Sequence, residues 1–373
     1  MRLAHIATLG IKELRSLMRD PMMLGLIIYA FTVAIYTAAT AMPEVLNKAP
    51  IDVVDEDRSA LSARITGAFY PPYFMPPAVT TLQEMDRRMD AGLTTFSLDI
   101  PPNFQRDVLA GRSPDLQLNV DATRMSQAFT GGGYVQAIVA GEVAAFVQRY
   151  RAATAVPVDL ALRARFNPTL SKARFGAVIE VINNLTMLSI ILTGAALIRE
   201  REHGTIEHLL VMPVTPFEIM AAKIWAMALV VLGAAAFALI FIVQGLLGVP
   251  IQGSVALFLA GAAIHLFATT SMGIFLATMA RSMPQFALLV IMVILPLEML
   301  SGGMTPRESM PDLVRMVMLA APTTHYVMLA QAILFRGAGF SVVWPQFIAI
   351  AGIGAALFGL ALMRFRKSVG EIG

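Results

Sequence analysis

The sequence predicts a helical membrane protein in which six transmembrane helices carry an α/β domain inserted after the first of them. Hydrophobic residues make up 57% of the 373 residues and charged residues only 14%, whereas soluble domains are about 45–50% apolar and about 25% charged. Several charge-free runs reach the roughly 20 residues that a helix needs to cross a bilayer. One long segment between the first two runs instead shows the charge and alternation of a folded domain.

Residues 1–20 precede the first apolar run and predict an amphipathic helix that lies on a membrane surface. Glu13 and Asp20 fall in this segment. The apolar run that follows is longer than the apolar core of a secretory signal, which spans about 7–15 residues. We therefore expect this run to remain in place as a transmembrane helix. The apolar and basic positions of the segment are Ile6, Leu9, Leu14, Leu17, Lys12, Arg15 and Arg19.

The remaining transmembrane helices follow from the same search for uncharged runs. No charge occurs between Asp20 and Glu44, or between Lys223 and Arg281. The second of these stretches is too long for one helix, and "LGVPIQGS" at 247–254 divides it into two. The expected transmembrane helices are 21–42, 176–198, 224–247, 255–280, 284–302 and 341–363.

Lysine and arginine residues near the helix ends predict the orientation, because short cytoplasmic loops are enriched in them. With the N-terminus inside, eleven basic residues fall in the short cytoplasmic segments 1–20, 199–223 and 364–373 and in the turn near residue 281, against three outside. Both termini are therefore expected in the cytoplasm. The inner residues are Arg2, Lys12, Arg15, Arg19, Arg199, Arg201, Lys223, Arg281, Arg364, Arg366 and Lys367, and the outer ones are Arg307, Arg315 and Arg336.

Segment 43–175 is expected outside the cytoplasm as a small α/β domain. It holds 14 basic and 14 acidic residues, and a long loop crosses the membrane largely regardless of charge. The tripeptide "GGG" at 131–133 is too short for a phosphate loop and is expected to form a flexible bend before a helix. The expected strands are 51–57, 94–100 and 115–122, and the expected helices are 59–69, 101–111 and 134–150.

The cytoplasmic connection 199–223 is expected to contain a short helix over 205–212, which ends before a proline. Thr215 at the N-cap and Glu218 three residues later predict a capping box at the start of the third transmembrane helix. Pro216 fits the first helical position.

Charges of both signs occupy five consecutive positions at 199–203 in a chain that otherwise avoids charge. A lipid anchor would be mostly basic, so the mixed signs favour a surface that docks another protein. The alternative is that these charges only mark a helix end and are solvated.

Four stretches resemble one family, the ABC-2 type transporter permeases, which form the membrane half of exporters driven by a separate ATP-binding-cassette ATPase. The stretches are "REREHGTIEHLLVMPVTPFEIMAAKI" (199–224), "LNVDATRMSQA" (118–128), "FNPTLSKARF" (166–175) and the segment 300–347 that begins "LSGGMTPRESMP". The chain is similar to the subgroup with a large extracytoplasmic domain after the first helix.

The resemblance implies roles for several segments. It implies a coupling helix that contacts the ATPase, an interfacial connecting helix at 1–20, and short helices at 303–340 that dip back into the outer leaflet. It also implies a dimer of six-helix halves, with a second copy or a related permease; we expect 176–198 and 284–302 at that interface. The ATPase-coupling residues that it implies are Arg199, Glu200, Arg201, Glu202, His203, Gly204, Thr205, Glu207 and His208.

No cofactor is expected in this chain. The dipeptide "GK" is absent, so no Walker A loop is present and ATP is expected to bind to the partner ATPase. The chain has no cysteine, which excludes disulfides and thiolate metal sites. His203 and His208 have no third ligand nearby, so no metal site is predicted.

Isolated polar residues in the transmembrane helices are candidates for a transport pathway or an interface. Glu298 is one, although it lies near the outer end of its helix, where water could reach it. Asn183 and Asn184 fit hydrogen bonding between helices better than substrate contact. His265 and His325 are interpreted as packing or interfacial residues.

The sequence leaves two other functions open. A membrane sensor would use the outer domain as a receptor, but no inner segment is long enough for a signalling domain. An ion-coupled transporter would need buried ionisable residues or an internal repeat. We expect an exporter in a bacterial inner membrane, contacting lipids and no nucleic acid, with hydrophobic or amphiphilic cargo as in multidrug efflux. A periplasmic adaptor is a further expected partner.

Overall fold

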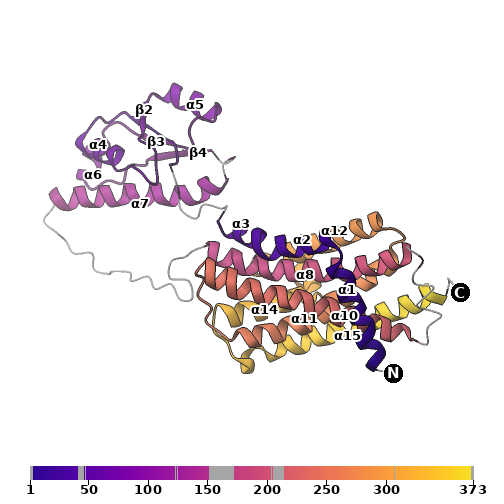
Figure 1. Cartoon of the computed structure of the whole chain (residues 1–373). Helices are drawn as coiled ribbons and strands as arrows, with labels where there is room; N and C mark the ends of the chain where they lie inside the picture. Colours follow the sequence, from indigo (N-terminus) through magenta and orange to yellow (C-terminus); the bar gives the residue numbers. More distant parts are fainter. Residues whose placement is uncertain are drawn as a thin grey trace. The chain divides into compact units, whose positions relative to one another are not determined.

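The computed structural model describes residues 3–40, 46, 48–121, 123, 125–150, 172–202, 204, 214–305 and 307–370. The chain divides into two compact units, residues 1–42 with 164–373, and residues 43–163. The first unit is helical and the second combines a small sheet with helices (Figure 1). The predicted fold class, six apolar helices with an inserted α/β region, is confirmed.

Among the described residues of the helical unit, six helices are long and apolar enough to cross a membrane. They span Pro21–Thr40, Gly176–Glu202, Pro216–Leu246, Val255–Met279, Met283–Leu300 and Phe340–Lys367. Its elements are α1 (Leu3–Met18), α2 (Pro21–Tyr29), η1 (Ala30–Ala34), α3 (Ile35–Thr40), α8 (Lys172–Glu202), α10 (Pro216–Phe237), η2 (Ala238–Leu246), α11 (Val255–Met279), α12 (Met283–Leu300), η3 (Arg307–Ser309), α13 (Asp312–Met318), α14 (Pro322–Leu334) and α15 (Phe340–Gly370).

Helix α8 lies at the centre of this unit, side by side with α10 and α11 (Figure 1). In its most apolar stretch 83% of the residues are buried, against 22% in α12 and 17% in α15. A helix enclosed by its own chain has little surface left for another subunit. The expectation that both 176–198 and 284–302 face a second copy therefore fits α12 and does not fit α8.

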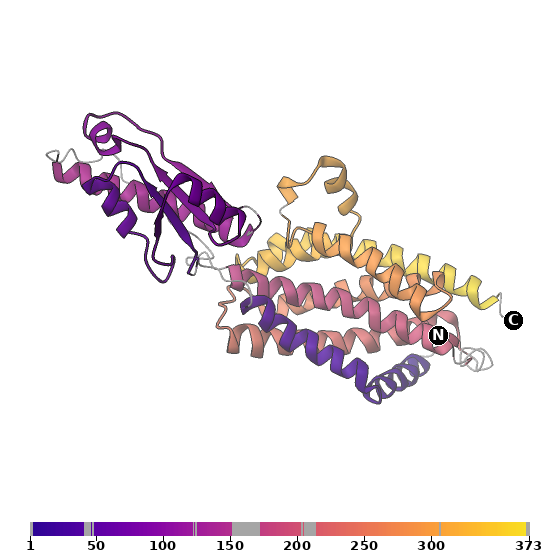
Figure 2. The ribbon, with the colours of Figure 1, turned by 90° about the horizontal axis from the view of Figure 1, so that it is seen from above.

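Helices α13 and α14 form a pair bent by 89° between α12 and α15. The bend falls at residues 319–321, just before Pro322, because proline starts a helix well but cannot continue one. Figure 2 shows the short segment after α12 standing away from the long helices. That these helices dip back into the outer leaflet stays a prediction, which the family resemblance implies.

The α/β unit is built on a four-stranded sheet in the order β2-β1-β3-β4. Strand β1 pairs in parallel with β2 and β3, and β3 pairs antiparallel with β4. The sequence analysis missed β2, a three-residue edge strand, and α5, a short polar helix whose apolar residues are Leu82, Met85 and Met89. The elements are β1 (Ile51–Asp55), α4 (Ala60–Gly67), β2 (Ala78–Thr80), α5 (Leu82–Asp90), β3 (Phe96–Ile100), α6 (Phe104–Leu109), β4 (Gln117–Val120) and α7 (Met125–Tyr150).

The glycines at 131–133 lie inside α7, so the predicted bend before a helix is wrong. The reason is packing. A Cβ atom on Gly131 would come within 2.2 Å of the Phe96 ring, so only glycine lets the helix approach the sheet this closely. Gly132 and Gly133 have nothing within 4 Å of such an atom.

These three neighbouring glycines provide a matched test. Gly131→Ala is expected to destabilise the α/β unit by about 1–3 kcal/mol, the usual effect of overpacking a core. Gly132→Ala and Gly133→Ala should be neutral or stabilising by up to about 1 kcal/mol, because alanine loses less backbone freedom on folding. Pulse proteolysis in urea would rank the variants. Equal stability of all three would show that α7 does not press on β3 at Gly131.

Candidate functional site

The candidate site is built where α1, the end of α8 and the start of α10 meet. The inner face of α1 lies against α10, with Gly10, Glu13 and Leu17 buried. The Trp225 indole N–H donates to the Ile6 carbonyl at 3.1 Å, and its ring lies directly over Gly10, where a Cβ atom would come within 2.1 Å. The amphipathic segment is therefore packed against a specific partner helix.

Lys223 is the centre of a buried ion network that joins these three helices. Its side chain is 2% exposed, and its Nζ lies 3.0 Å from Glu13 Oε1 and 2.7 Å from Glu200 Oε2. Lys12 Nζ lies 2.5 Å from Glu200 Oε1 and 3.5 Å from Glu13 Oε1. Two lysines and two carboxylates thus neutralise one another. Since removing one member of a buried pair leaves an uncompensated charge, the network fixes α1 to both membrane helices.

Lys12 lies at the edge of this network, and its side chain is half exposed. Burial disfavours its charge, but the hydrogen bond and ion pair with Glu200, together with Glu13, outweigh that effect and raise the pKa of Lys12. The ammonium is therefore charged at any physiological pH, and the network keeps its balance.

A second ion pair joins the beginning of α2 to the end of α8, between Asp20 and Arg199. Asp20 also caps α2 by accepting the Met23 N–H at 3.1 Å. This backbone hydrogen bond, followed by the Arg199 interaction, lowers the pKa of Asp20. The stabilisation is complete above the ordinary aspartate pKa and is lost as pH falls through the lowered value.

The last turn of α8 also holds the connection between α11 and α12. Arg201 Nη1 donates to the carbonyl of Ala280 at 2.6 Å. Glu202 Oε1 accepts the backbone N–H of Met283 at 2.9 Å, at the start of α12. Residues 199–202 therefore end a helix and bind other elements of the same chain. The predicted connection begins at 199, whereas α8 continues to Glu202.

The segment between α8 and α10 is described only in part. Gly204 is an exposed turn residue with φ of +68°, a conformation that favours glycine after a helix. His203, Thr205, Glu207, His208 and the helix predicted over 205–212 lie outside the described residues.

Helix α10 begins at Pro216, the first helical position that the sequence predicts, ahead of the membrane crossing expected from residue 224. Thr215 Oγ1 accepts the Glu218 N–H at 3.3 Å, and Glu218 Oε2 accepts the Thr215 N–H at 2.8 Å. This reciprocal pair is the capping box that the sequence predicts. The partly described segment therefore lies between the end of α8, which ion pairs tie to its neighbours, and the capped start of α10.

Polar groups also meet inside the bundle. Asn184 is buried and donates to the carbonyl of Ala30, in the π-helical segment η1, at 2.8 Å. A π-helical turn shifts the backbone pairing and leaves such carbonyls for other donors. Asn184 also donates to Glu180 Oε1 at 3.3 Å, and both line a cavity of about 480 Å³ beside α2 and α3. Asn184 therefore packs two helices together as well as lining a cavity.

The other polar candidates have different surroundings. Asn183 is half-buried, and so is Glu298 on α12, which interacts electrostatically with Glu180. His265 is fully buried, with its Nε2 2.9 Å from Thr186 Oγ1 and its ring stacked on Tyr326. These contacts give His265 a packing role, as the sequence predicts.

Sequence reasoning missed the residue at the centre of the site. In the sequence, Lys223 contributes only to the excess of basic residues on the cytoplasmic side, and Glu13 only argues against a secretory signal. The available signal was a charge in the second turn of a helix that otherwise contains only apolar residues after Glu218. Its partner Glu13 lies 210 positions away, so the pairing itself needed the structure.

Comparison with known proteins extends over both units. The chain matches the model described as ABC-2 family transporter protein over residues 22–363. It is 62% identical over 370 residues to the Inner membrane transport permease YhhJ of Escherichia coli (strain K12), with 99% of each chain covered. It is 26% identical over 367 residues to the Probable multidrug ABC transporter permease YbhR of the same strain, which covers 97% of this chain and 98% of the relative. With the Probable multidrug ABC transporter permease YbhS it shares 27% over 347 residues and 89% of each chain.

Proposed function

The chain belongs to the ABC-2 family of transporter proteins, and on this premise we propose that it is an export permease driven by a separate ATP-binding-cassette ATPase. The observation that supports this most is how the helices on either side of residues 203–215 are held. The network around Lys223 ties the end of α8 to α10, and the capping box at Thr215 closes the start of α10. A force applied to this segment would move α8 and α10 together.

In this proposal, the residues of the site have two different roles. Arg199, Glu200, Arg201 and Glu202 bind α2, α10, α11 and α12, so their role in the proposal is to transmit movement within the chain. Direct contact with the ATPase is assigned to His203, Gly204, Thr205, Glu207 and His208. Transport then results from a switch between two arrangements of packed helices, both biased by the same partner.

The location proposed is a bacterial inner membrane with both termini in the cytoplasm. Basic residues crowd the ends that would face inward, and the relative with 62% identity is named an inner membrane permease. The exposed side of α12 carries large apolar residues that suit lipid or a second permease copy. These are Leu288, Ile291, Met292, Leu295 and Met299.

The cargo proposed is hydrophobic or amphiphilic. Two relatives are named multidrug permeases, and the cavity beside Glu180 and Asn184 is otherwise lined mainly by apolar residues. In this proposal the α/β unit lies outside the cytoplasm and meets a periplasmic adaptor. Glu298, Asn183 and Asn184 are candidate pathway or interface residues.

Reconstitution tests the energy source. In proteoliposomes containing the permease and its co-purified ATPase, efflux of a fluorescent amphiphilic dye is expected to require hydrolysable ATP. An ionophore that collapses ion gradients should leave the rate unchanged. Vesicles with the permease alone should not transport, because this chain has no Walker A loop.

Two outcomes would favour the other functions. Transport by the permease alone under a proton or sodium gradient would identify an ion-coupled transporter. Ligand binding to residues 43–163 with no transport under any condition would favour a sensor.

A further inference from the structure

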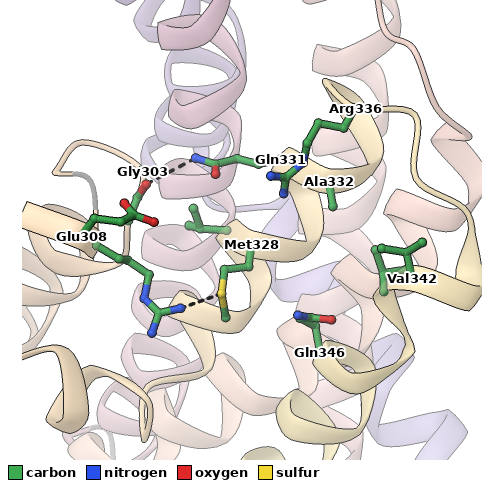
Figure 3. Close-up of a pocket in the computed structure, with 12 residues that line it drawn as sticks. Gly303, Glu308, Met328, Gln331, Ala332, Arg336, Val342 and Gln346 are labelled. Atoms are coloured by element: carbon green, nitrogen blue, oxygen red, sulfur yellow. Dashed lines mark hydrogen bonds between the residues drawn. The ribbon is translucent and has the colours of Figure 1, made fainter. Parts of the chain in front are cut away.

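A polar cavity lies between the segment 302–308, helix α14 and the beginning of α15. It measures about 560 Å³, and Arg307, Gln331, Arg336 and Gln346 face it from three different elements. Figure 3 shows Gln331 on α14 and Arg336 in the turn after α14 on one side, and Gln346 on α15 opposite. Nothing in the proposed ATPase contact uses this cavity.

The Arg307 guanidinium lacks a strong acceptor. Its Nη1 donates to Met328 Sδ at 2.7 Å, and its Nε is buried without a partner. A thioether is a weak acceptor, and a buried N–H without a hydrogen bond is unfavourable. The arrangement therefore has room for an acceptor that the chain itself does not provide.

The remaining polar groups of the cavity include a second cation, Arg336, and an unpaired acceptor, Gln346 Oε1, which needs a donor. Within the described part of the chain, neither Arg307 nor Arg336 forms an ion pair, although Glu308 also lines the cavity. Gln331 uses its amide on the Gly302 carbonyl at 3.3 Å, and Gln346 Oε1 is buried without a partner. Two arginines against one glutamate give the cavity a net positive charge.

We propose that this cavity binds the anionic headgroup of an amphiphile, with a phosphate or carboxylate between Arg307 and Arg336. A guanidinium binds such groups through two parallel hydrogen bonds. The source favoured is a lipid, because the cavity opens beside the exposed first turns of α15, a candidate membrane helix. Phe340, Val342 and Trp344 are exposed there and would contact acyl chains, as aromatic residues do at membrane interfaces.

Lipid binding to the purified permease, without any ATPase, tests this inference apart from the proposed function. The probes are phosphatidylglycerol and phosphatidylcholine with identical acyl chains, titrated into detergent-solubilised protein and counted by native mass spectrometry. Both lipids carry a phosphate, but choline would place a quaternary ammonium beside two arginines. Phosphatidylglycerol is therefore expected to bind at least about tenfold more tightly, because such a like-charge contact is unfavourable. Arg307→Gln and Arg336→Gln should each reduce that preference about tenfold.

Arg315→Gln is the matched control, because Arg315 lies on the neighbouring α13 and pairs with Asp312 at 2.7 Å outside the cavity. It should keep the preference. Val342→Trp retains both arginines and narrows the cavity, so it should weaken phosphatidylglycerol binding even if an arginine variant misfolds.

Inorganic phosphate separates the two sources of an anion. Phosphate that displaces phosphatidylglycerol supports the shared site, and phosphate that binds when the lipid does not assigns a free anion to it. Equal binding of the two lipids with no binding of phosphate would overturn the proposal. Anion binding that survives in Arg307→Gln and Arg336→Gln to the same degree as in Arg315→Gln would also overturn it.

Discussion

Lys223→Met is expected to destabilise the helical unit by roughly 3–5 kcal/mol, the usual effect of removing one member of a buried ion pair. Methionine fills a similar volume, so packing changes little. Glu13 and Glu200 would instead remain close together, with only Lys12 to neutralise them. Thermal unfolding in detergent should show a lower melting temperature, and proteolysis should release the α1 segment first.

The control for this variant is Arg315→Met, which removes an exposed ion pair on α13. Exposed pairs contribute about 0–1 kcal/mol, so its stability should stay close to the parent. The triple variant Glu13→Gln, Glu200→Gln, Lys223→Met should recover much of the loss, because replacing a whole buried network is often nearly neutral. If Lys223→Met were as stable as Arg315→Met, α1 would not be anchored by this network.

The transmembrane helices could be predicted from sequence because the requirement is local. An uncharged run of sufficient length has few alternatives in a bilayer. The boundary near 199 failed because charge was taken to end a helix, whereas α8 continues to Glu202. Glu200 remains helical since Lys223 neutralises it across the α8–α10 contact. Whether a charge is solvated or paired depends on packing that the local sequence does not contain.

The α/β unit shows the same limit. Strand β3 alternates apolar and polar residues, and β1 carries Ile51, Val53 and Val54, so both could be predicted. Strand β2 has only three residues, and its partner is set by the parallel register with β1. The glycines at 131–133 predicted a break by their backbone freedom, but the ring of Phe96 selects glycine at the first position. Tertiary packing there overrides helix propensity.

The enclosed position of α8 also changes how the candidate site is interpreted. Periodicity cannot distinguish a helix surrounded by protein from one surrounded by lipid, because both are apolar on all sides. The charges at 199–202 consequently looked like a surface for another protein. They are bound by this chain's own helices, which leaves the segment after them as the place where a partner can act.

Glu207→Arg is expected to reduce ATPase co-purification and ATP-driven dye efflux at least about tenfold, because a like-charge contact at an interface costs several kcal/mol. The melting temperature of the permease should change little, since the network around Lys223 and the capping box at Thr215 are both intact. Glu84→Arg, a reversal of the same charge in the α/β unit, should leave ATPase binding and efflux unaltered.

Lys223→Met and Glu207→Arg separate the anchoring of α1 from the docking of the ATPase. Lys223→Met should still bind the ATPase at temperatures where it is folded, but it should transport poorly because α1, α8 and α10 no longer move as one body. Glu207→Arg should be stable and unable to bind. If Glu207→Arg retained the ATPase and full efflux, the contact with the ATPase would lie elsewhere on the chain. The ion network around Lys223 would then have a role other than transmitting movement from residues 203–215.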